Sequence, residues 1–501
     1  MGTPGPDSHQ AGVVRARHPR DEPVSIVLER TEARFLVATV VSIGLVVAVV
    51  GTLGAPLITA VAQYYHVSLA AAQWTLTIAL LSGAVATPLL GRLGSGPRRR
   101  AVILTTLSVV VAGSALTVLP LPFALLLLGR AGQGVGLGLT ALMMATARDH
   151  LSEAHSASTI ALLAVASTAG IGIGYPLSGL LTDVAGIRAA YALGLLVTSA
   201  VLVTALMVLP PAPSRASAGV DLPGVALLSS GLLALLIVIS QTELWRQHPA
   251  LAGVILAGAV LLLGAWILVE LRMEHPLVDI RLLRDPVVAA ANLAMLTAGI
   301  GMYLLLSLIT RYVQTPIVAG YGFGLDTFQA GLVLVPFSAL GFVAGKTSAP
   351  LRARYSARAL LSSSVVLVLA ATVLFALVRG HLAEPILAMS LLGLGVGAFS
   401  AAMPAVILAV TPKNETASAM SVNQVVRAVG FSIGSAIGGL VLAGYTTGVY
   451  PRASGYGTAA WIAAATTGAA LLFIAARHPR AQHSRRAGRR PRAHADQAAA
   501  R

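Results

Sequence analysis

The segment Gly-Gln-Gly-Val-Gly at residues 132–136 lies inside a long apolar run, and Gly-Leu-Gly-Val-Gly at 393–397 lies inside another. Two further matches stand at nearly the same offset, about 260 residues, and in the same order. They pair Gly170, Gly174, Gly179 and Leu180 with Gly430, Gly434, Gly439 and Leu440, and Arg100-Ala101 with Arg358-Ala359. Small residues recur wherever helices pack closely in a membrane. Three matched segments in one order nevertheless indicate two copies of one helical unit.

The composition indicates that lipid surrounds most of the chain. Of 501 residues, 56% are apolar and 10% are charged, whereas a soluble domain carries roughly 25% charged residues. A surface this poor in charge cannot be covered by water. Because only helices and closed barrels satisfy every backbone group in lipid, and the apolar runs are long, we predict an all-α polytopic membrane protein.

A membrane-spanning helix needs about 20 mostly apolar residues, and the sequence holds about fourteen such runs. They lie at 34–56, 70–91, 99–119, 121–143, 157–181, 187–210, 222–241, 249–270, 287–311, 327–346, 358–378, 384–410, 416–444 and 458–476. The repeat groups the first six and the last six into two like bundles with two helices inserted between them. Two such bundles are expected to hold a substrate at their interface and to rock about it.

This organisation predicts five segments. They are a basic cytoplasmic N-terminal tail (1–33), an N-terminal six-helix bundle (34–210), two inserted helices with linkers (211–285), a C-terminal six-helix bundle (286–476) and a basic disordered cytoplasmic tail (477–501).

The net charge of +16 is distributed as in cytoplasmic loops. Basic residues gather in both tails and in alternate loops; the loop sets are Arg98, Arg99 and Arg100, then Arg272, Arg281 and Arg284, then Lys346, Arg352, Arg354 and Arg358. We therefore expect both termini in the cytoplasm and a multi-pass protein of the cell membrane, here a bacterial inner membrane. Anionic membrane lipids are the expected partners of the tails, and nucleic acid is not. We expect a monomer.

Several chemistries lack the residues they need. The chain has no cysteine, nothing resembles a metal-ligand cluster, and no phosphate-binding loop of the ATPase type is present. The glycines at 132–138 lie within a continuous apolar run, so they favour helix packing over dinucleotide binding. We expect no cofactor and no metal, and a protein that is not an enzyme.

Two helices carry motifs of a known family. Arg130, Gln133 and Gly134 in the fourth run resemble the Arg-x-x-Gln-Gly motif of the major facilitator superfamily, specifically its fourteen-span drug:proton antiporter family. The fifth run resembles that family's antiporter signature through Gly170, Gly174, Pro176 and Gly179, although its proline stands one position late. The resemblance covers roughly 34–476. It implies proton antiport with alternating access, and a part for Arg130 in proton transfer.

The flanks of the inserted helices favour the fourteen-span branch. The segment Asp221-Leu-Pro-Gly224 opens the first inserted helix in the family's style, and 269–283 is similar to the family's link after the second. The loop with Gly91, Arg98 and Arg99 aligns with the family's cytoplasmic loop motif, but it is one residue short and has Ser95 in or near the place of an aspartate. That aspartate belongs to a charge latch between the bundles, so the departure bears on gating.

Charged groups inside a bilayer are expensive, at least about 2.5–3.5 kcal/mol each on insertion scales. Arg130 and Arg427 lie well inside predicted spans. For Arg130 we favour coupling or gating, together with Gln133, Gly134 and Asp149, over the structural alternative of capping backbone carbonyls. For Arg427 the two interpretations are equal. Asp149, beside Arg148, is interpreted as a surface ion pair, and no carboxylate is expected at mid-depth.

The cavity candidates are Trp74, Tyr303, Asn423, Gln424 and Arg427. Because they include a cation and no acid, a neutral, zwitterionic or anionic amphiphile fits better than a cation, although aromatic side chains can equally be packing. We predict a secondary active exporter of hydrophobic or amphiphilic small molecules (drugs, antibiotics or natural products), coupled to protons. The alternatives are a lipid or glycolipid translocator or an uncoupled facilitator. A membrane-embedded enzyme or scaffold would need a convergent acid/base or metal set, and none is visible.

Overall fold

The computed structural model describes residues 30–53, 57–67, 69–211, 221–240, 242–273, 280–446 and 450–475. Within these ranges the chain is helical, apart from one isolated bridge between Thr446 and Pro451. The helices are α1 (Arg30–Thr52), α2 (Ile58–Tyr65), α3 (Leu69–Leu93), α4 (Arg99–Val118), α5 (Phe123–Val135), α6 (Leu139–His150), α7 (Glu153–Ala185), α8 (Ile187–Val208), α9 (Leu222–Ser240), α10 (Thr242–Gln247), α11 (Pro249–Arg272), α12 (Pro286–Gln314), α13 (Thr327–Arg352), α14 (Ala357–Leu377), α15 (Ala383–Leu408), α16 (Thr416–Gly444) and α17 (Ala453–Ala475), with short 3₁₀ turns η1 (Gly136–Gly138), η2 (Ile280–Arg284), η3 (Ile317–Ala319) and η4 (Lys413–Glu415).

Twelve helical segments among the described residues are long and apolar enough to cross a membrane. One of them, Phe123–His150, runs through α5, η1 and α6. The 33-residue α7 and the 19-residue α9 stand where the fifth and seventh predicted spans were expected. Helix α1 begins at Arg30 rather than at 34. The all-helical fold class is confirmed, and the count of fourteen spans stays a prediction.

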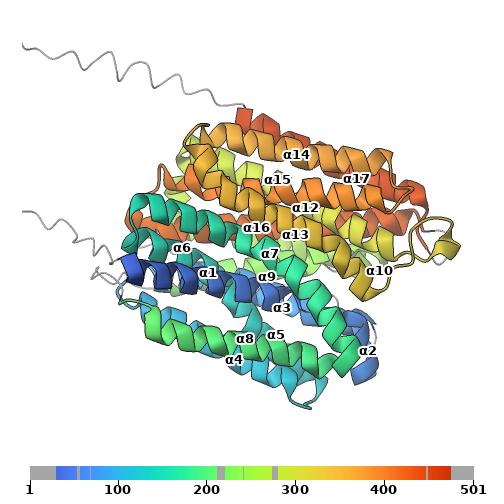
Figure 1. Ribbon diagram of the computed structural model, residues 1–501, viewed down its shortest axis with the longest axis horizontal. Coiled ribbons are helices and arrows are strands. Elements are labelled where there is room, and N and C mark those ends of the chain that lie inside the picture. Colours follow the sequence, from blue (N-terminus) through green and yellow to red (C-terminus); the bar gives the residue numbers. More distant parts are fainter. Residues whose placement is uncertain are drawn as a thin grey trace, which may run out of the picture.

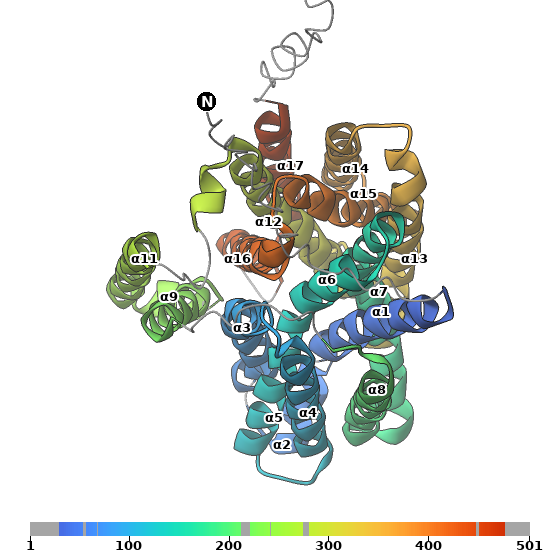
Figure 2. The same ribbon diagram turned by 90° about the vertical axis from the view of Figure 1, so that its left-hand side faces the viewer.

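The helices form two bundles with a hairpin at their side (Figures 1 and 2). Helices α1 to α8 make the N-terminal bundle and α12 to α17 the C-terminal bundle. Helices α9 and α11 pack on each other, and α9 contacts α3 of one bundle and α16 of the other. The tails, 1–29 and 476–501, lie outside the described residues.

The two bundles meet through two equivalent contacts. Helix α7 packs on α13, and α3 packs on α16. In the repeat, α7 corresponds to α16 and α3 corresponds to α13. The two contacts are therefore the same contact made twice, as expected for two like bundles related by an internal repeat.

The glycines of the repeated motif lie where helices pack closely. Their contacts show which glycine of one copy corresponds to which glycine of the other. A Cβ on Gly134 would lie 2.1 Å from Ala79 O of α3, and one on Gly393 would lie 2.1 Å from Phe337 O of α13. The contact of Gly134 with Ala79 corresponds to that of Gly393 with Phe337. The contact of Gly136 with Val110 likewise corresponds to that of Gly395 with Val368. The matching by sequence letters paired Gly134 with Gly395, which is two residues off, because glycine identity does not report which face of a helix a position occupies.

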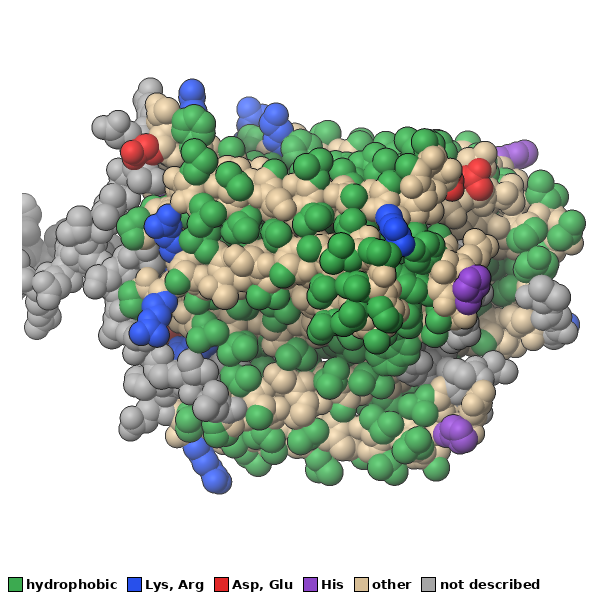
Figure 3. All heavy atoms as spheres, turned by 90° about the horizontal axis from the view of Figure 1, so that it is seen from below, with side chains coloured by type: hydrophobic (Ala, Val, Ile, Leu, Met, Phe, Trp, Pro, Cys, Tyr) green, Lys and Arg blue, Asp and Glu red, His purple; other side chains and the backbone are tan. Residues whose placement is uncertain are grey.

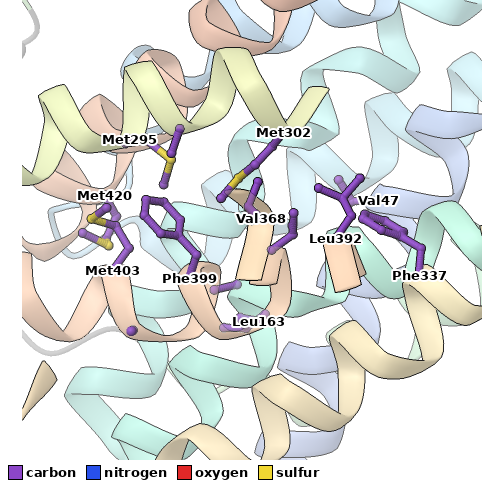
Figure 4. Close-up of a cluster of buried hydrophobic side chains, with 14 of the residues drawn as sticks. Val47, Leu163, Met295, Met302, Phe337, Val368, Leu392, Phe399, Met403 and Met420 are labelled. Atoms are coloured by element: carbon purple, nitrogen blue, oxygen red, sulfur yellow. The ribbon is translucent and has the colours of Figure 1, made fainter. Parts of the chain in front are cut away.

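A large cluster of apolar side chains extends through the core of both bundles. Figure 4 shows part of it, where Met295, Met302, Met403 and Met420 gather around Phe399. On the face seen in Figure 3, apolar side chains cover the middle, and most Lys and Arg side chains lie toward the end where α1 begins. An apolar belt with one basic end is the surface expected of a membrane-spanning bundle.

Candidate functional site

Arg130 is completely buried inside the N-terminal bundle. Its Nε donates to Thr75 O of α3 (2.9 Å), and Nη1 donates to Val50 O of α1 (3.0 Å) and to Gln133 Oε1 (2.6 Å). Gln133 Nε2 in turn donates to Ser114 Oγ of α4 at 3.0 Å. Arg130 and Gln133 thus tie α5 to three neighbouring helices. Such contacts are those expected if Arg130 has the structural role of capping backbone carbonyls. A role of Arg130 in coupling or gating stays a prediction.

Gly134 sets the distance between α5 and α3. We expect Gly134→Ala to lower the free energy of unfolding by about 1–3 kcal/mol, because the added methyl group meets backbone atoms that cannot move aside. The measurement is thermal unfolding in detergent. Gly253→Ala on α11 is the matched control, since nothing lies within 4 Å of its added Cβ. Equal unfolding temperatures for the two variants would show that Gly134 does not set this contact.

The helix with the antiporter-like motif lies at the bundle interface. Gly170 of α7 faces α1, where its Cβ would meet Ala48 and Val49. Pro176 lies against Gly331 of α13, and Gly179 lies against Phe328 at the start of the same helix. Gly174 is buried between these positions. The small residues of this motif therefore let α7 approach α1 on one side and α13 on the other.

At the basic end, Gly91 lies at the corresponding contact between α3 and α16. A Cβ there would meet Ser421 Oγ at 2.2 Å and Ala417 O at 3.3 Å. Arg98 is exposed and precedes α4. The Ser95 hydroxyl donates to Arg92 O at 2.7 Å, within its own loop.

Asp149, an acidic residue at the basic end, has a different partner from the one that the sequence predicted. Arg99 Nη1 and Asp149 Oδ2 form an ion pair at 2.5 Å, with side chains 3% and 2% exposed. Arg99 Nε also donates to Gly94 O at 2.6 Å. The assignment of Asp149 to a surface ion pair with Arg148 was therefore wrong. The ion pair joins α6 to the start of α4 in the interior, and the separation of fifty positions between the partners hid it from sequence reasoning.

Arg148, which the sequence interpretation gave no role of its own, bridges the two bundles. Its guanidinium donates to Thr416 Oγ1 (2.7 Å) and to the carbonyl oxygens of Leu408 and Thr411 (both 3.0 Å). Leu408 ends α15, and backbone carbonyls at a helix C-terminus attract cations. We call Arg148 and these three acceptors the Arg148 clamp. Arg352 of α13 adds a contact to Ala157 O of α7 at 3.3 Å, and partial burial lowers the pKa of its guanidinium.

Aromatic and cationic side chains meet where α12 packs on α16. Tyr303 of α12 stacks on Phe431 of α16 with ring centroids 5.2 Å apart, and Arg427 lies 5.8 Å from the Phe431 ring centroid. Tyr175 of α7 has a longer-range electrostatic interaction with Tyr303. We call Tyr175, Tyr303, Arg427 and Phe431 the central aromatic set. Phe431 and Tyr175 were missed, although the spacing of Phe431 one helical turn after Arg427 was a usable signal.

The other cavity candidates lie elsewhere. Asn423 is buried, and its Nδ2 donates to Asn292 Oδ1 of α12 at 3.2 Å. Trp74 packs beside Leu236 of α9 in an apolar cluster that also contacts α16. Gln424 is partly exposed on α16. The structure therefore joins Tyr303 and Arg427 but places Asn423 inside the C-terminal bundle and Trp74 against the inserted hairpin.

A separate cavity of about 500 Å³ opens at the end of the C-terminal bundle opposite the Arg148 clamp. Residues of α12, α16, α17 and the segment between α16 and α17 line it, among them Arg311, Gln314, Tyr450 and Tyr456. It includes none of the sequence-predicted cavity residues.

A family model described as Major Facilitator Superfamily matches residues 40–325 and 293–497. The chain belongs to this superfamily. The resemblance seen at the fourth and fifth spans is thereby confirmed, and the chain is a multi-span membrane transporter rather than an enzyme.

Several curated relatives are named as transporters or as multidrug resistance proteins. The chain is 29% identical over 399 residues to a probable actinorhodin transporter of Streptomyces coelicolor, covering 75% of this chain and 67% of that protein. It is 27% identical over 384 residues to a multidrug resistance protein B homolog of Mycobacterium tuberculosis (74% and 68%). It is 24% identical over 400 residues to the uncharacterized MFS-type transporter YvkA of Bacillus subtilis (79% and 87%).

Solved structures share the fold. The human organic anion transporter MFSD10 (TETRAN) superposes with a TM-score of 0.62 at 16% identity, covering 88% of this chain and 99% of that one. The Escherichia coli fucose:proton symporter FucP gives a TM-score of 0.58 at 16% identity, covering 87% and 97%.

Proposed function

We propose that this transporter exports hydrophobic or amphiphilic small molecules, such as antibiotics or other natural products, in exchange for protons. Relatives named as an actinorhodin transporter and as multidrug resistance proteins support this substrate class. Fourteen spans, two six-helix bundles at 34–210 and 286–476, and a hairpin inserted at 211–285 form the proposed architecture. The basic end is the cytoplasmic side, because basic loops stay inside, and both termini lie there.

The observation that carries the proposal is the central aromatic set. It joins Tyr303, Phe431 and Arg427 of the C-terminal bundle, and Tyr175 of the N-terminal bundle has a longer-range electrostatic interaction with Tyr303. Stacked rings beside a cation offer an amphiphile both an apolar face and an electrostatic anchor. A neutral or anionic amphiphile therefore fits this set better than a cationic one.

Alternating access requires the two bundles to separate at one end at a time. The α7–α13 and α3–α16 contacts are the surfaces about which the bundles rock in our proposal. The Arg148 clamp holds the cytoplasmic end closed, in place of the latch whose aspartate the loop with Ser95 lacks.

We expect Arg148→Ala to raise the accessibility of the cytoplasmic end several-fold, because three hydrogen bonds from a charged donor are lost at once. The chain contains no cysteine, so a single cysteine introduced at Ser421 reports labelling by a thiol reagent without background. Arg354→Ala, an exposed arginine at the same end, is the control. Unchanged labelling in Arg148→Ala would show that the Arg148 clamp does not hold the cytoplasmic end closed.

The test of the substrate site is binding of labelled amphiphiles to purified protein. Arg427→Ala is expected to weaken binding of anionic compounds about ten-fold or more, since a charged partner contributes roughly 1.5–3 kcal/mol. Phe431→Leu is expected to weaken the binding of all aromatic compounds. Lys346→Ala is the control, because Lys346 is exposed on α13. Equal affinities in wild type and Arg427→Ala for every compound would reject this site.

One observation favours the second candidate, an uncoupled facilitator or a lipid or glycolipid translocator. Described carboxylates such as Asp149, Asp183, Glu270 and Asp326 lie near span ends, whereas proton coupling requires a group that gains and loses a proton during the cycle. Movement of substrate without proton movement would select this candidate.

A further inference from the structure

The cavity of about 500 Å³ at the end of the C-terminal bundle has no part in the transport cycle above. Its volume lies within the range of about 300–1,000 Å³ that is usual for pockets that bind small molecules. Thr416 of the Arg148 clamp begins α16, whereas Ala443 of the cavity wall lies in the last turn of that helix. The cavity therefore opens at the opposite end of the bundle from the clamp. We call it the Arg311 cavity, after the arginine in its wall.

Arg311 is the only charged residue among the described residues that line this cavity. Apart from a longer-range electrostatic interaction with Tyr303, its guanidinium forms no hydrogen bond or ion pair with a residue that the structure describes. Arg379 at the same end differs, because its guanidinium donates to three backbone carbonyl oxygens. Basic residues favour the cytoplasmic side of a membrane protein, so an arginine at this end without a protein acceptor needs a reason.

The buried hydroxyl groups of the wall are bonded within the protein. Thr315 Oγ1 donates to Arg311 O at 2.9 Å. Because a hydroxyl group has a single hydrogen, Tyr456 is the donor in the 3.3 Å contact between its own hydroxyl and Thr315 Oγ1. Both side chains are buried, and neither has a hydrogen left for a ligand.

The exposed polar side chains of the wall differ from one another. Gln314 Nε2 donates to Thr310 O, and Thr446 Oγ1 donates to Leu442 O, each within its own helical segment. Tyr450 is 39% exposed, and its hydroxyl has no hydrogen bond with a described residue. The guanidinium of Arg311 and the hydroxyl of Tyr450 are therefore the main donors that the wall offers to a ligand.

Aromatic packing holds this wall in place. The ring centroid of Tyr456 lies 5.2 Å from that of Tyr312 and 5.6 Å from that of Tyr321. The Tyr321 hydroxyl donates to Pro451 O, which fixes the segment between α16 and α17. A site that is formed in advance loses less conformational freedom on binding.

The rest of the wall is apolar. Leu442, Pro316 and Pro451 contribute to it, and they offer surface to a hydrocarbon chain or a ring. The described lining includes no acid, so a cationic head group would meet only the like charge of Arg311. A carboxylate or phosphate, in contrast, accepts charge-assisted hydrogen bonds from a guanidinium.

We propose that the Arg311 cavity binds an anionic amphiphile, whose carboxylate or phosphate is held by Arg311 and Tyr450 and whose apolar part lies against Leu442 and Pro451. An acidic membrane lipid and an acidic compound from solution share this chemistry. Binding in this cavity is independent of the central aromatic set and of the compounds that the set carries.

The test is protection of a single cysteine in the full-length protein in nanodiscs of zwitterionic phosphatidylcholine. The chain contains no cysteine, so Ala443→Cys, at an exposed position of the wall, reports access to the cavity through its rate of labelling by a water-soluble maleimide. Dodecyl phosphate is expected to slow labelling several-fold. Dodecanol and dodecyltrimethylammonium, which have the same chain with a neutral or a cationic head, are expected to change the rate little.

Arg311→Gln in the Ala443→Cys background keeps a polar side chain but removes the charge. It is expected to raise the concentration of dodecyl phosphate needed for half protection about ten-fold or more, because hydrogen bonds from a charged donor are lost. Tyr450→Phe, which keeps the ring, is expected to cause a smaller rise. Arg452→Gln is the matched control, since Arg452 is an exposed arginine of the same end that does not line the cavity.

Nanodiscs that contain phosphatidylglycerol distinguish the two sources of the ligand. Slow labelling of Ala443→Cys in phosphatidylglycerol without added compound, reversed by Arg311→Gln, assigns the ligand to the membrane lipid. Protection by dodecyl phosphate alone assigns it to a compound from solution. Equal labelling rates with and without dodecyl phosphate in both membranes would overturn the proposal, as would protection that dodecanol matches or that Arg311→Gln leaves unchanged. The labelling rate reports on this cavity alone, so such a failure leaves the proposed export untouched.

Discussion

Arg130→Ala is expected to produce one of the two largest losses of stability of any single substitution in this chain. Truncation leaves the carbonyl oxygens of Thr75 and Val50 and the amide oxygen of Gln133 without their donor inside the N-terminal bundle. A hydrogen bond from a charged donor contributes about 1.5–3 kcal/mol, and the emptied volume adds to the loss. We expect a loss of about 3–5 kcal/mol, measured by thermal unfolding in detergent. Arg98→Ala, an exposed arginine, is expected to change little.

Arg130→Lys separates a structural role from a coupling role. Lysine keeps the charge, but it cannot reproduce the planar set of donors that reaches α1 and α3 together. If Arg130 is structural only, transport should recover in proportion to stability. If it also takes part in coupling, as the family resemblance implies, Arg130→Lys should be stably folded and still inactive in energised vesicles. Full transport in Arg130→Lys would show that Arg130 has a structural role only.

The second large effect is expected at the buried ion pair. Asp149→Ala leaves the Arg99 guanidinium buried without its counter-charge, and Arg99→Ala does the same to Asp149. Removing one partner of a buried pair costs about 3–5 kcal/mol. The double variant should lose clearly less than the two single losses combined, because the second substitution removes the stranded charge.

Unfolding in denaturant or by heat measures this cycle, with Asp183→Ala as the exposed control. Additive losses would mean that the two side chains do not act as a pair. A stable Asp149→Ala variant would mean that Arg99 moves to another partner or to water.

The fold could be predicted from the sequence because lipid imposes strong rules. Apolar runs of sufficient length had to be helices, and the repeat gave the two-bundle arrangement. What failed was detail that depends on helix faces. Gly134 corresponds by contact to Gly393 rather than Gly395, and only the neighbouring helix identifies which face a glycine occupies.

The candidate site was less accessible to sequence reasoning. Arg130 and Arg427 could be identified because charges inside spans are rare. Asp149 was given the neighbouring Arg148 as partner, yet in the structure Arg148 points to the other bundle and Asp149 points to Arg99. Adjacent residues on a helix point about 100° apart, so proximity in sequence misled.

Proton release from energised inside-out vesicles is the measurement that decides whether export is coupled to protons. A pH-gradient dye is recorded while a panel of amphiphiles is added, and wild type is compared with Arg427→Ala. At least one neutral or anionic amphiphile is expected to dissipate the gradient in wild-type vesicles and not in the variant. If labelled compounds cross the membrane with no change in the dye signal, proton antiport is contradicted and the facilitator or lipid translocator replaces it.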